Sequence, residues 1–258
     1  MTTALPRPAA TTEAARPRPG YVHAEILRTF RNFRFFIFSL VFPLVLFLFI
    51  AGPQRDQHVQ GIPLPTYFMA GMVAWGTMAA VIAGGARISM ERQVGWSRQL
   101  RVTPLSARRY LGTKVLTGYV MALASIVLLY GAGVLLGVRL SALDWIEMTA
   151  LILIGLIPFA LMGIAIGHLI TPDSLGPALG GLTSLFALLG GSWGPIASQT
   201  GWLHQVVELL PSYWLVQAGH VATADGPWTA EAWIVILVWS VAMARLAQWA
   251  FRRDTERQ

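Results

Sequence analysis

Residues 64–86 read LPTYFMAGMVAWGTMAAVIAGGA, and no charged side chain interrupts them. A helix that crosses a lipid bilayer needs roughly 20 apolar residues, because the hydrocarbon core is about 30 Å thick. Directly after this run comes a basic stretch, residues 87–114, which reads RISMERQVGWSRQLRVTPLSARRYLGTK. An apolar run of this length followed by a basic loop predicts a membrane span that ends at a charged surface.

Five more apolar runs flank this pair, and charges enter only the last of them, at Glu231 and Arg245. Of the 258 residues, 55% are hydrophobic and 12% are charged, about half the charged fraction of an ordinary soluble domain. A soluble fold would have too little polar surface, so we expect an all-α membrane protein with six transmembrane helices. The predicted spans are residues 35–54, 64–86, 115–138, 148–171, 174–192 and 228–251.

The eighteen arginines and one lysine lie almost entirely on one side of these spans. The N-terminal tail holds six of them, the loop between the second and third spans seven, and the C-terminal end four. The loops on the other side hold only Arg55 and Arg139. Lys and Arg are retained on the cytoplasmic side of membrane proteins, so we expect both termini in the cytoplasm. The net charge of +7 is then a topology signal, and a nucleic-acid partner is not expected.

The N-terminus divides into two parts. Residues 1–20 are rich in Pro, Ala, Thr and Arg and predict a disordered tail, followed by one transmembrane domain over residues 21–258. Between Tyr21 and the first span, one helical face carries apolar side chains and the other faces are polar. This pattern predicts an amphipathic helix in the headgroup plane, the alternative being a cytoplasmic extension of the first span. The apolar side chains are Val22, Ile26, Phe30 and Phe33.

The outer loop, residues 194–226, contains no Lys or Arg but carries Trp202, Tyr213 and Trp214 among aliphatic residues. It is too apolar for a free loop, and Gly and Pro interrupt it too often for a full span. We expect short re-entrant helices before the last span, because helices satisfy their own backbone groups in lipid. An aromatic loop lying on the membrane surface is the alternative.

Small residues recur at four-residue spacing in several spans, which permits close contact between helices. The fifth span concentrates them, at Gly176, Gly180 and Ser184. We expect this span to be a tightly packed internal helix or one that faces a second copy of the chain. Pro43 and Pro158 predict kinks in the first and fourth spans.

The sequence shows no residues that would couple transport to an ion, hydrolyse ATP or catalyse a reaction. No carboxylate lies deep in a span, no phosphate-loop motif occurs, and cysteine is absent. Residues 190–194, GGSWG, match the G-x-S-x-G pattern of serine hydrolases. A membrane protease would pair Ser192 with His168, but the predicted topology puts them near opposite faces. We therefore expect no catalytic residue, metal site or cofactor in this chain.

The basic loop resembles the E-R-x-x-G…L-x-x-T-P-x-S…Y-L signature of type-2 ABC exporter permeases, a group that includes drug-efflux and polysaccharide-export subunits. Residues 91–111 read ERQVGWSRQLRVTPLSARRYL, and residues 38–44 and 210–214 also look like that family. Trp96 and Arg98 stand where relatives often carry Thr and Glu. The alternative is that the basic loop only fixes the orientation of the chain in the membrane and binds no partner protein.

The resemblance implies a homodimer paired with two soluble ABC ATPase subunits, which would hold the ATP and Mg²⁺. It implies that the loop docks on the ATPase and that the loop between the fourth and fifth spans makes a second contact. The implied docking residues are Glu91, Arg92, Gly95, Leu100, Thr103, Pro104 and Ser106, and those of the second contact are Thr171, Pro172 and Asp173.

These expectations give one functional hypothesis. The chain is expected to be a multi-pass subunit in the bacterial plasma membrane, not an enzyme by itself, that exports a hydrophobic or amphipathic compound such as an antibiotic. The uncharged spans favour an apolar substrate path. The alternatives are export of a lipid-linked glycan or teichoic-acid-type polymer and, less favoured, an intramembrane serine protease.

Overall fold

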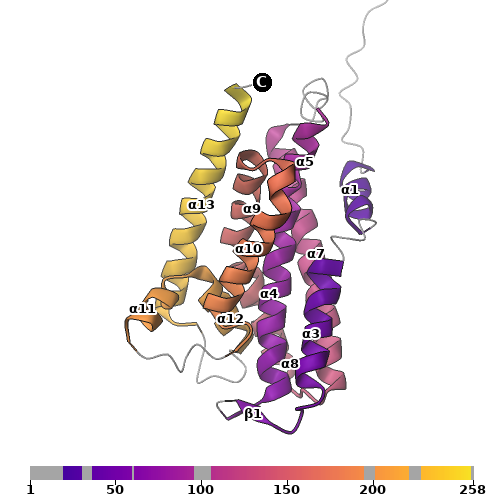
Figure 1. The fold of residues 1–258 in the computed structure, drawn as a ribbon, viewed down its shortest axis with the longest axis vertical. Coiled ribbons are helices and arrows are strands. Elements are labelled where there is room, and N and C mark those ends of the chain that lie inside the picture. Colours follow the sequence, from indigo (N-terminus) through magenta and orange to yellow (C-terminus); the bar gives the residue numbers. More distant parts are fainter. Residues whose placement is uncertain are drawn as a thin grey trace, which may run out of the picture.

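The computed structural model describes residues 20–30, 37–59, 61–95, 106–194, 201–220 and 228–256. Nearly all of them are helical, and the long helices run along the long axis of the molecule (Figure 1). The elements are α1 (Gly20–Phe30), the π-helical turn η1 (Ile37–Val41), α3 (Phe42–Ala51), β1 (His58–Val59), β2 (Ile62–Pro63), α4 (Leu64–Ala86), α5 (Ile88–Gln93), α7 (Ala107–Leu135), α8 (Ala142–Gly155), α9 (Ile157–Leu169), α10 (Pro172–Gly190), α11 (Trp202–Glu208), α12 (Pro211–His220) and α13 (Ala230–Glu256).

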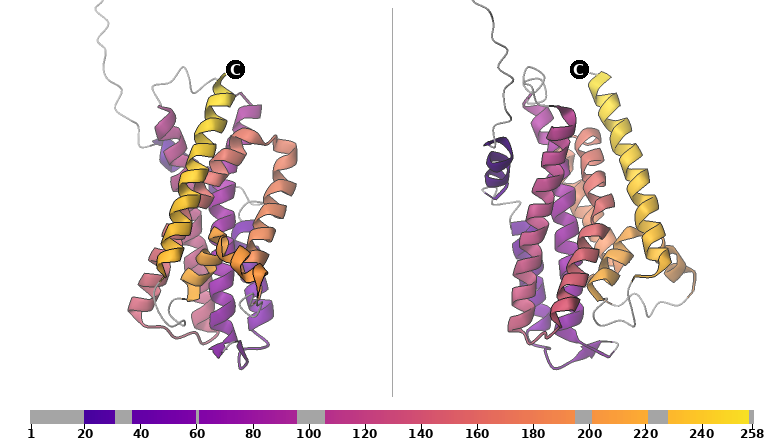
Figure 2. Two further views of the ribbon diagram at one scale, coloured as in Figure 1. Left: turned by 90° about the vertical axis from the view of Figure 1, so that its left-hand side faces the viewer. Right: turned by 180° about the vertical axis from the view of Figure 1, so that it is seen from behind.

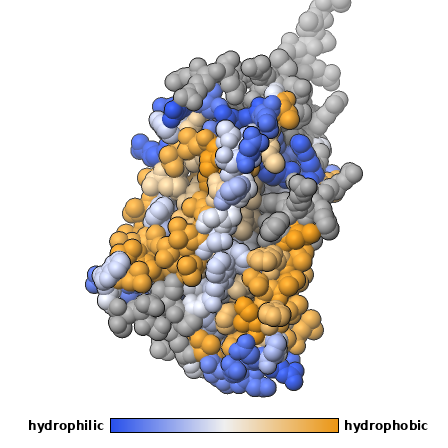
Figure 3. All heavy atoms as spheres, viewed as in Figure 1, coloured by the Kyte–Doolittle hydropathy of each residue, from blue (hydrophilic) through white to orange (hydrophobic). Residues whose placement is uncertain are grey.

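The two ends of the bundle differ. One end carries the antiparallel hairpin of β1 and β2. The other, which we call the Arg-rich end, carries α5, the start of α7 and the C-terminal part of α13, with α1 beside it (Figure 1). Hydrophilic side chains gather at both ends, and hydrophobic ones cover much of the surface between them (Figure 3). This distribution fits a protein whose middle lies in hydrocarbon.

The predicted all-α membrane class is confirmed, because the described residues contain four helical stretches long and apolar enough to cross a bilayer. They are Leu64–Gln93, Arg108–Leu135, Ala142–Leu169 and Ala230–Asp254. The other two predicted spans, residues 35–54 and 174–192, fall on η1 with the short α3 and on α10. The third of the four stretches is interrupted at Leu156, between α8 and α9, next to the predicted kink at Pro158.

Helix α4 lies at the centre of the bundle. It packs against α3, α7, α9, α10 and α12, and most of its side chains are buried on every face. A helix that is apolar all round has no face to present to water and is buried by its neighbours. By contrast, α13 lies along the outside of the bundle and packs mainly on α9 (Figure 2). Its remaining surface is left for lipid.

Glycines let α4 touch its neighbours backbone to backbone. A Cβ on Gly163 of α9 would lie 2.4 Å from the carbonyl oxygen of Ile82. A Cβ on Gly84 would lie 3.0 Å from the Cα of Gly118 in α7, and one on Gly85 would lie 2.6 Å from the backbone of Gly163. Two adjacent glycines of α4 therefore contact two different helices, and neither contact has room for a methyl group.

The small residues of the fifth predicted span behave differently. Added Cβ atoms on Gly176, Gly180 and Gly181 of α10 would meet nothing within 4 Å. Only near the end of the helix is the contact close, where a Cβ on Gly190 would lie 2.8 Å from the carbonyl oxygen of Ser212. The sequence predicts that this helix is either tightly packed inside the chain or facing a second copy. Tight packing inside the chain is confined to the end at Gly190.

The described part of residues 194–226, the predicted outer loop, contains the short helices α11 and α12. Helix α12 packs against α4, α8 and α10. The indole of Trp214 donates a hydrogen bond of 2.7 Å to the carbonyl oxygen of Glu208, and that of Trp239 donates one of 2.8 Å to Leu209. These bonds satisfy carbonyl groups at the end of α11, which the helix itself leaves unpaired.

The contact of α4 with α9 can be tested by adding one methyl group. Gly163→Ala should lower the free energy of unfolding by about 1–3 kcal/mol, the cost of overpacking a close contact. Unfolding of the purified chain in mixed micelles by SDS measures the change. Gly131→Ala in α7 is the matched control, because its Cβ would meet nothing within 4 Å. Equal stability of the two variants would contradict the proposed constraint.

Candidate functional site

Helix α5 continues α4 beyond Arg87 at the Arg-rich end, and its faces differ sharply. Ile88, Ser89 and Glu91 are buried. Met90 and Val94 are 52% and 72% exposed although both are apolar. These two residues are four positions apart and therefore share one side of the helix. The segment thus has an inner face held by the bundle and an outer face directed to solvent.

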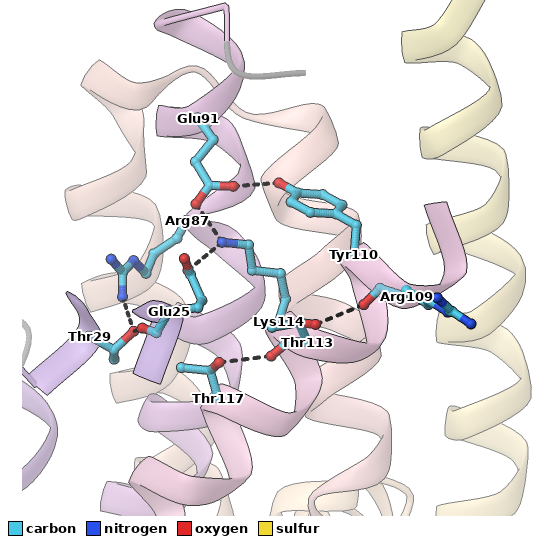
Figure 4. A network of polar contacts seen from close by, with 9 residues as sticks. All are labelled: Glu25, Thr29, Arg87, Glu91, Arg109, Tyr110, Thr113, Lys114 and Thr117. Carbon is cyan, nitrogen blue, oxygen red and sulfur yellow. Dashed lines mark hydrogen bonds and ion pairs between the residues drawn. The ribbon is translucent and has the colours of Figure 1, made fainter. Parts of the chain in front are cut away.

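A buried ion cluster holds the inner face of α5, as Figure 4 shows. Its centre is Lys114 of α7, which is only 1% exposed. The Nζ atom of Lys114 forms ion pairs with Glu91 of α5 and, at 2.5 Å, with Glu25 of α1. The second carboxylate oxygen of Glu91 accepts a hydrogen bond of 2.5 Å from the Tyr110 hydroxyl. One ammonium group thus joins three helices.

A second contact ties α1 to the junction of α4 and α5. The Nη1 atom of Arg87 donates a hydrogen bond to the Thr29 hydroxyl, which itself donates to the carbonyl oxygen of Glu25 at 2.9 Å. Arg87 also interacts electrostatically with the carboxylates of Glu25 and Glu91. Two cations and two anions therefore share the cluster, and their formal charges cancel.

The neighbouring residue, Arg92, points to a different part of the bundle. Its Nη2 atom lies 2.5 Å from Oδ1 of Asp254 in α13. Its Nη1 atom donates to the carbonyl oxygens of His168, at 2.7 Å, and Gly167, at 3.3 Å, at the end of α9. The other oxygen of Asp254 lies 3.0 Å from Nδ1 of His168. This second cluster joins α5, α9 and α13.

The residues of the predicted second contact lie at the same end. The Ser89 hydroxyl of α5 donates a hydrogen bond of 2.5 Å to the carbonyl oxygen of Ile170, just before them. Thr171 is the N-cap residue of α10, and Asp173 lies in the first turn. Both are exposed, and Pro172 is half-buried. An acidic side chain in this place is favourable for the helix dipole.

The structure places the other predicted docking residues as follows. Gly95 ends the α5 turn with a φ of 72°, which favours glycine. Ser106 is exposed and caps α7 by accepting a hydrogen bond from the backbone of Arg109. Leu100, Thr103 and Pro104 lie outside the described residues. Glu91 is predicted to dock on the ATPase, but it is buried, and its carboxylate binds Lys114 and Tyr110 inside the bundle.

Helix α1 covers the first part of the segment, residues 21–34, in which the interfacial helix is predicted. Val22 is exposed and Ile26 half-buried on this helix, while nothing is described of the side chain of Phe30 or of Phe33. The predicted tail, residues 1–20, lies outside the described residues except for Gly20, where α1 begins. Sequence reasoning missed that Glu25 holds α1 against α7.

Other residues of the clusters were missed as well, among them Lys114 and Asp254. A signal was present for the first, because Lys114 is the one lysine beside eighteen arginines. The lysine ammonium is a compact charge on a flexible stem and the arginine guanidinium a planar fork, so the two are not interchangeable at such a site. No comparable signal marked Asp254, which stands among charged residues at the end of the chain.

The structure does not bring the alternative catalytic pair together. His168 lies just before α10 and Ser192 just after it, and this helix has 19 residues. At a rise of 1.5 Å per residue they are separated by roughly 28 Å. Among the described residues, no group of three or more His, Asp or Glu could hold a metal ion.

Comparisons with known proteins identify a family and a similar protein. The sequence profile described as ABC-2 family transporter protein matches residues 64–247. The chain is also similar to a protein of Bacillus subtilis (strain 168) named as a transport permease, YvfS. The two are 24% identical over 233 residues, which is 90% of this chain and 95% of that protein.

The charge balance of the first cluster can be tested at Lys114. Lys114→Met should lower the free energy of unfolding by about 3–5 kcal/mol, because it removes a buried ion-pair partner and leaves two carboxylates with Arg87 as the one remaining cation of the cluster. SDS unfolding in mixed micelles measures the change, with Arg139→Met at the opposite end as the control. Adding Glu91→Gln to Lys114→Met should recover much of the loss, because the remaining cation Arg87 and the remaining anion Glu25 then balance. A double variant less stable than the single one would contradict the charge argument.

Proposed function

The chain belongs to the ABC-2 family of transporter proteins, and on that premise we propose that it is the membrane subunit of an ATP-driven exporter. A separate soluble ABC ATPase, in two copies, binds and hydrolyses ATP with Mg²⁺. This chain has no phosphate-loop motif and, in this proposal, is not an enzyme by itself. When the ATPase moves this membrane subunit, the subunit changes the side of the membrane to which its substrate path is open.

The observation that carries the proposal is the two-faced α5. Its inner face is tied to the bundle by Glu91 and Arg92, so force applied to it reaches other helices. Its outer face presents Met90 and Val94 to solvent at a charged end of the protein. Exposed apolar side chains are common on protein surfaces; these two support docking because they lie in the loop that resembles the docking loop of ABC exporter permeases.

The docking assignment follows from these faces. Met90, Gln93 and Val94 touch the ATPase, whereas Glu91 and Arg92 hold the helix that carries them. Gly95, Leu100, Thr103, Pro104 and Ser106 complete the docking loop, as the family resemblance implies. Thr171, Pro172 and Asp173 form the second contact, and their position beside α5 supports this.

In the membrane, the domain over residues 21–258 has six spans, with η1–α3 and α10 as the first and fifth. Both termini and the Arg-rich end face the cytoplasm of a bacterium, since Lys and Arg gather there. Helix α1 lies in the headgroup plane, which the exposed Val22 and Leu27 and the exposed Arg28 support. Helices α11 and α12 dip into the outer leaflet.

The proposed exporter is a homodimer. Gly176, Gly180 and Gly181 of α10 face open space in the single chain, and Leu185 and Leu188 are exposed on the same helix. A second copy can pack closely against such a surface, because small residues let helix backbones approach in lipid. The same feature fits the predicted dimer-facing role of this helix.

We propose a hydrophobic or amphipathic substrate, such as a drug or antibiotic. The predicted spans carry no carboxylate deep in the membrane. Beside α10, Trp193 packs edge-on against Trp75 of α4 at a ring distance of 5.1 Å, and Trp75 against Phe42 at 5.6 Å. This aromatic set can bind an apolar ring system. It offers no charge to a phosphate-linked polymer.

Co-purification tests the proposed function. The tagged chain, isolated from native membranes in mild detergent, should bring along a soluble protein with a phosphate-loop motif. Val94→Glu should abolish this, because it puts a charge into the apolar contact. Leu143→Glu is the control, since Leu143 is 70% exposed near the opposite end. The docking assignment fails if both variants retain the ATPase, and the function fails if the unmodified chain never binds one.

A further inference from the structure

We propose that Glu91 and Arg92 are positioning residues that connect α5 to two separate halves of the bundle. Only the consequence of this inference for transport rests on the proposed function. The connections themselves are properties of the single chain. Glu91 holds α5 to the half made by α1 and α7, and Arg92 holds it to the half made by α9 and α13.

The contacts of the two side chains do not overlap. Glu91 is held by Lys114 and Tyr110 of α7, besides its electrostatic interaction with Arg87, and Lys114 passes the link on to Glu25 of α1. Arg92 binds Asp254 of α13 and the end of α9. Adjacent residues of a helix point about 100° apart, since one turn takes 3.6 residues. One peptide bond therefore separates two different sets of partners.

The same division exists lower in the bundle. Gly84 of α4 contacts Gly118 of α7, and Gly85 contacts Gly163 of α9. Glu91 and Arg92 follow these glycines by seven residues, or about two helical turns. The two glycines hold α4 against each half through backbone contact. At α5, Glu91 and Arg92 bind the same two halves in the same order, through ion pairs.

The two halves are coherent units beyond these contacts. Helix α13 packs extensively on α9, and α1 packs on α7, while α4 lies between α7 and α9. A displacement of α5 therefore acts on both halves at once, through buried charges whose separation is costly. In the exporter, this makes the Glu91–Arg92 pair the point at which motion of the ATPase divides between the two halves.

Distances between spin labels on the single chain test this. The chain contains no cysteine, so labels can be placed by single substitutions. One pair joins Val94→Cys with Leu27→Cys on α1, and the other joins Val94→Cys with Arg253→Cys on α13. All three sites are exposed. Double electron–electron resonance of the chain in lipid nanodiscs gives each distance distribution.

The expected result is selective. Glu91→Gln should broaden the distribution from α5 to α1 and leave that from α5 to α13 narrow. Arg92→Gln should do the reverse, and Asp254→Asn should reproduce the effect of Arg92→Gln. Arg252→Gln, an exposed neighbour, is the matched control and should change neither. A general loss of structure would broaden both distributions, so selectivity separates positioning from mere stability.

Two outcomes overturn the proposal. Either variant broadening both distributions equally would mean that the two residues act as one structural unit. Unchanged distributions in both variants would mean that neither residue holds α5. In the complex with the co-purified ATPase, Glu91→Gln and Arg92→Gln should retain the partner and lose transport. If no ATPase binds the unmodified chain, the proposed exporter fails while the selective result on the single chain stands.

Discussion

The buried ammonium group of Lys114 is the constraint on which the Arg-rich end depends. A charge removed from water is costly unless other charges and hydrogen bonds compensate for it. The compensating carboxylates come from α1 and α5, which are far from α7 along the chain. Three segments must therefore meet before the charge can be buried. This requirement fixes α1 beside the bundle and gives α5 one defined orientation, with Met90 and Val94 outward.

Below this end, glycine rather than charge determines the arrangement. Helix α4 has apolar side chains on all sides, so the hydrophobic effect alone does not select its neighbours. Selection comes from where the backbone can be approached closely, at Gly84 for α7 and at Gly85 for α9. Packing in lipid and ion pairing near the water thus specify the same grouping of helices. Their agreement is typical of sequences that encode a single structure.

The sequence alone predicted the membrane class and most helix positions, because charge is excluded from hydrocarbon and uncharged runs therefore mark spans. It also located the loop around Glu91. It did not predict which charges turn inward. Glu91 and Lys114 lie 23 residues apart and Glu25 and Lys114 lie 89 apart, and pairing over such separations leaves no local pattern. For the same reason Glu91 had the signature of a surface residue, although it is only 5% exposed.

The backbone contact of α4 with α9 also limits how the protein can change shape. Side chains that interdigitate can exchange rotamers and let two helices slide. Between Ile82 and Gly163 there are no side chains to rearrange, only a carbonyl group facing a Cα atom. A slide of α4 along α9, or along α7 at Gly84, would therefore drive backbone against backbone. Motion that α5 passes to the two halves is consequently expected as a tilt about these contacts and not as a slide along them.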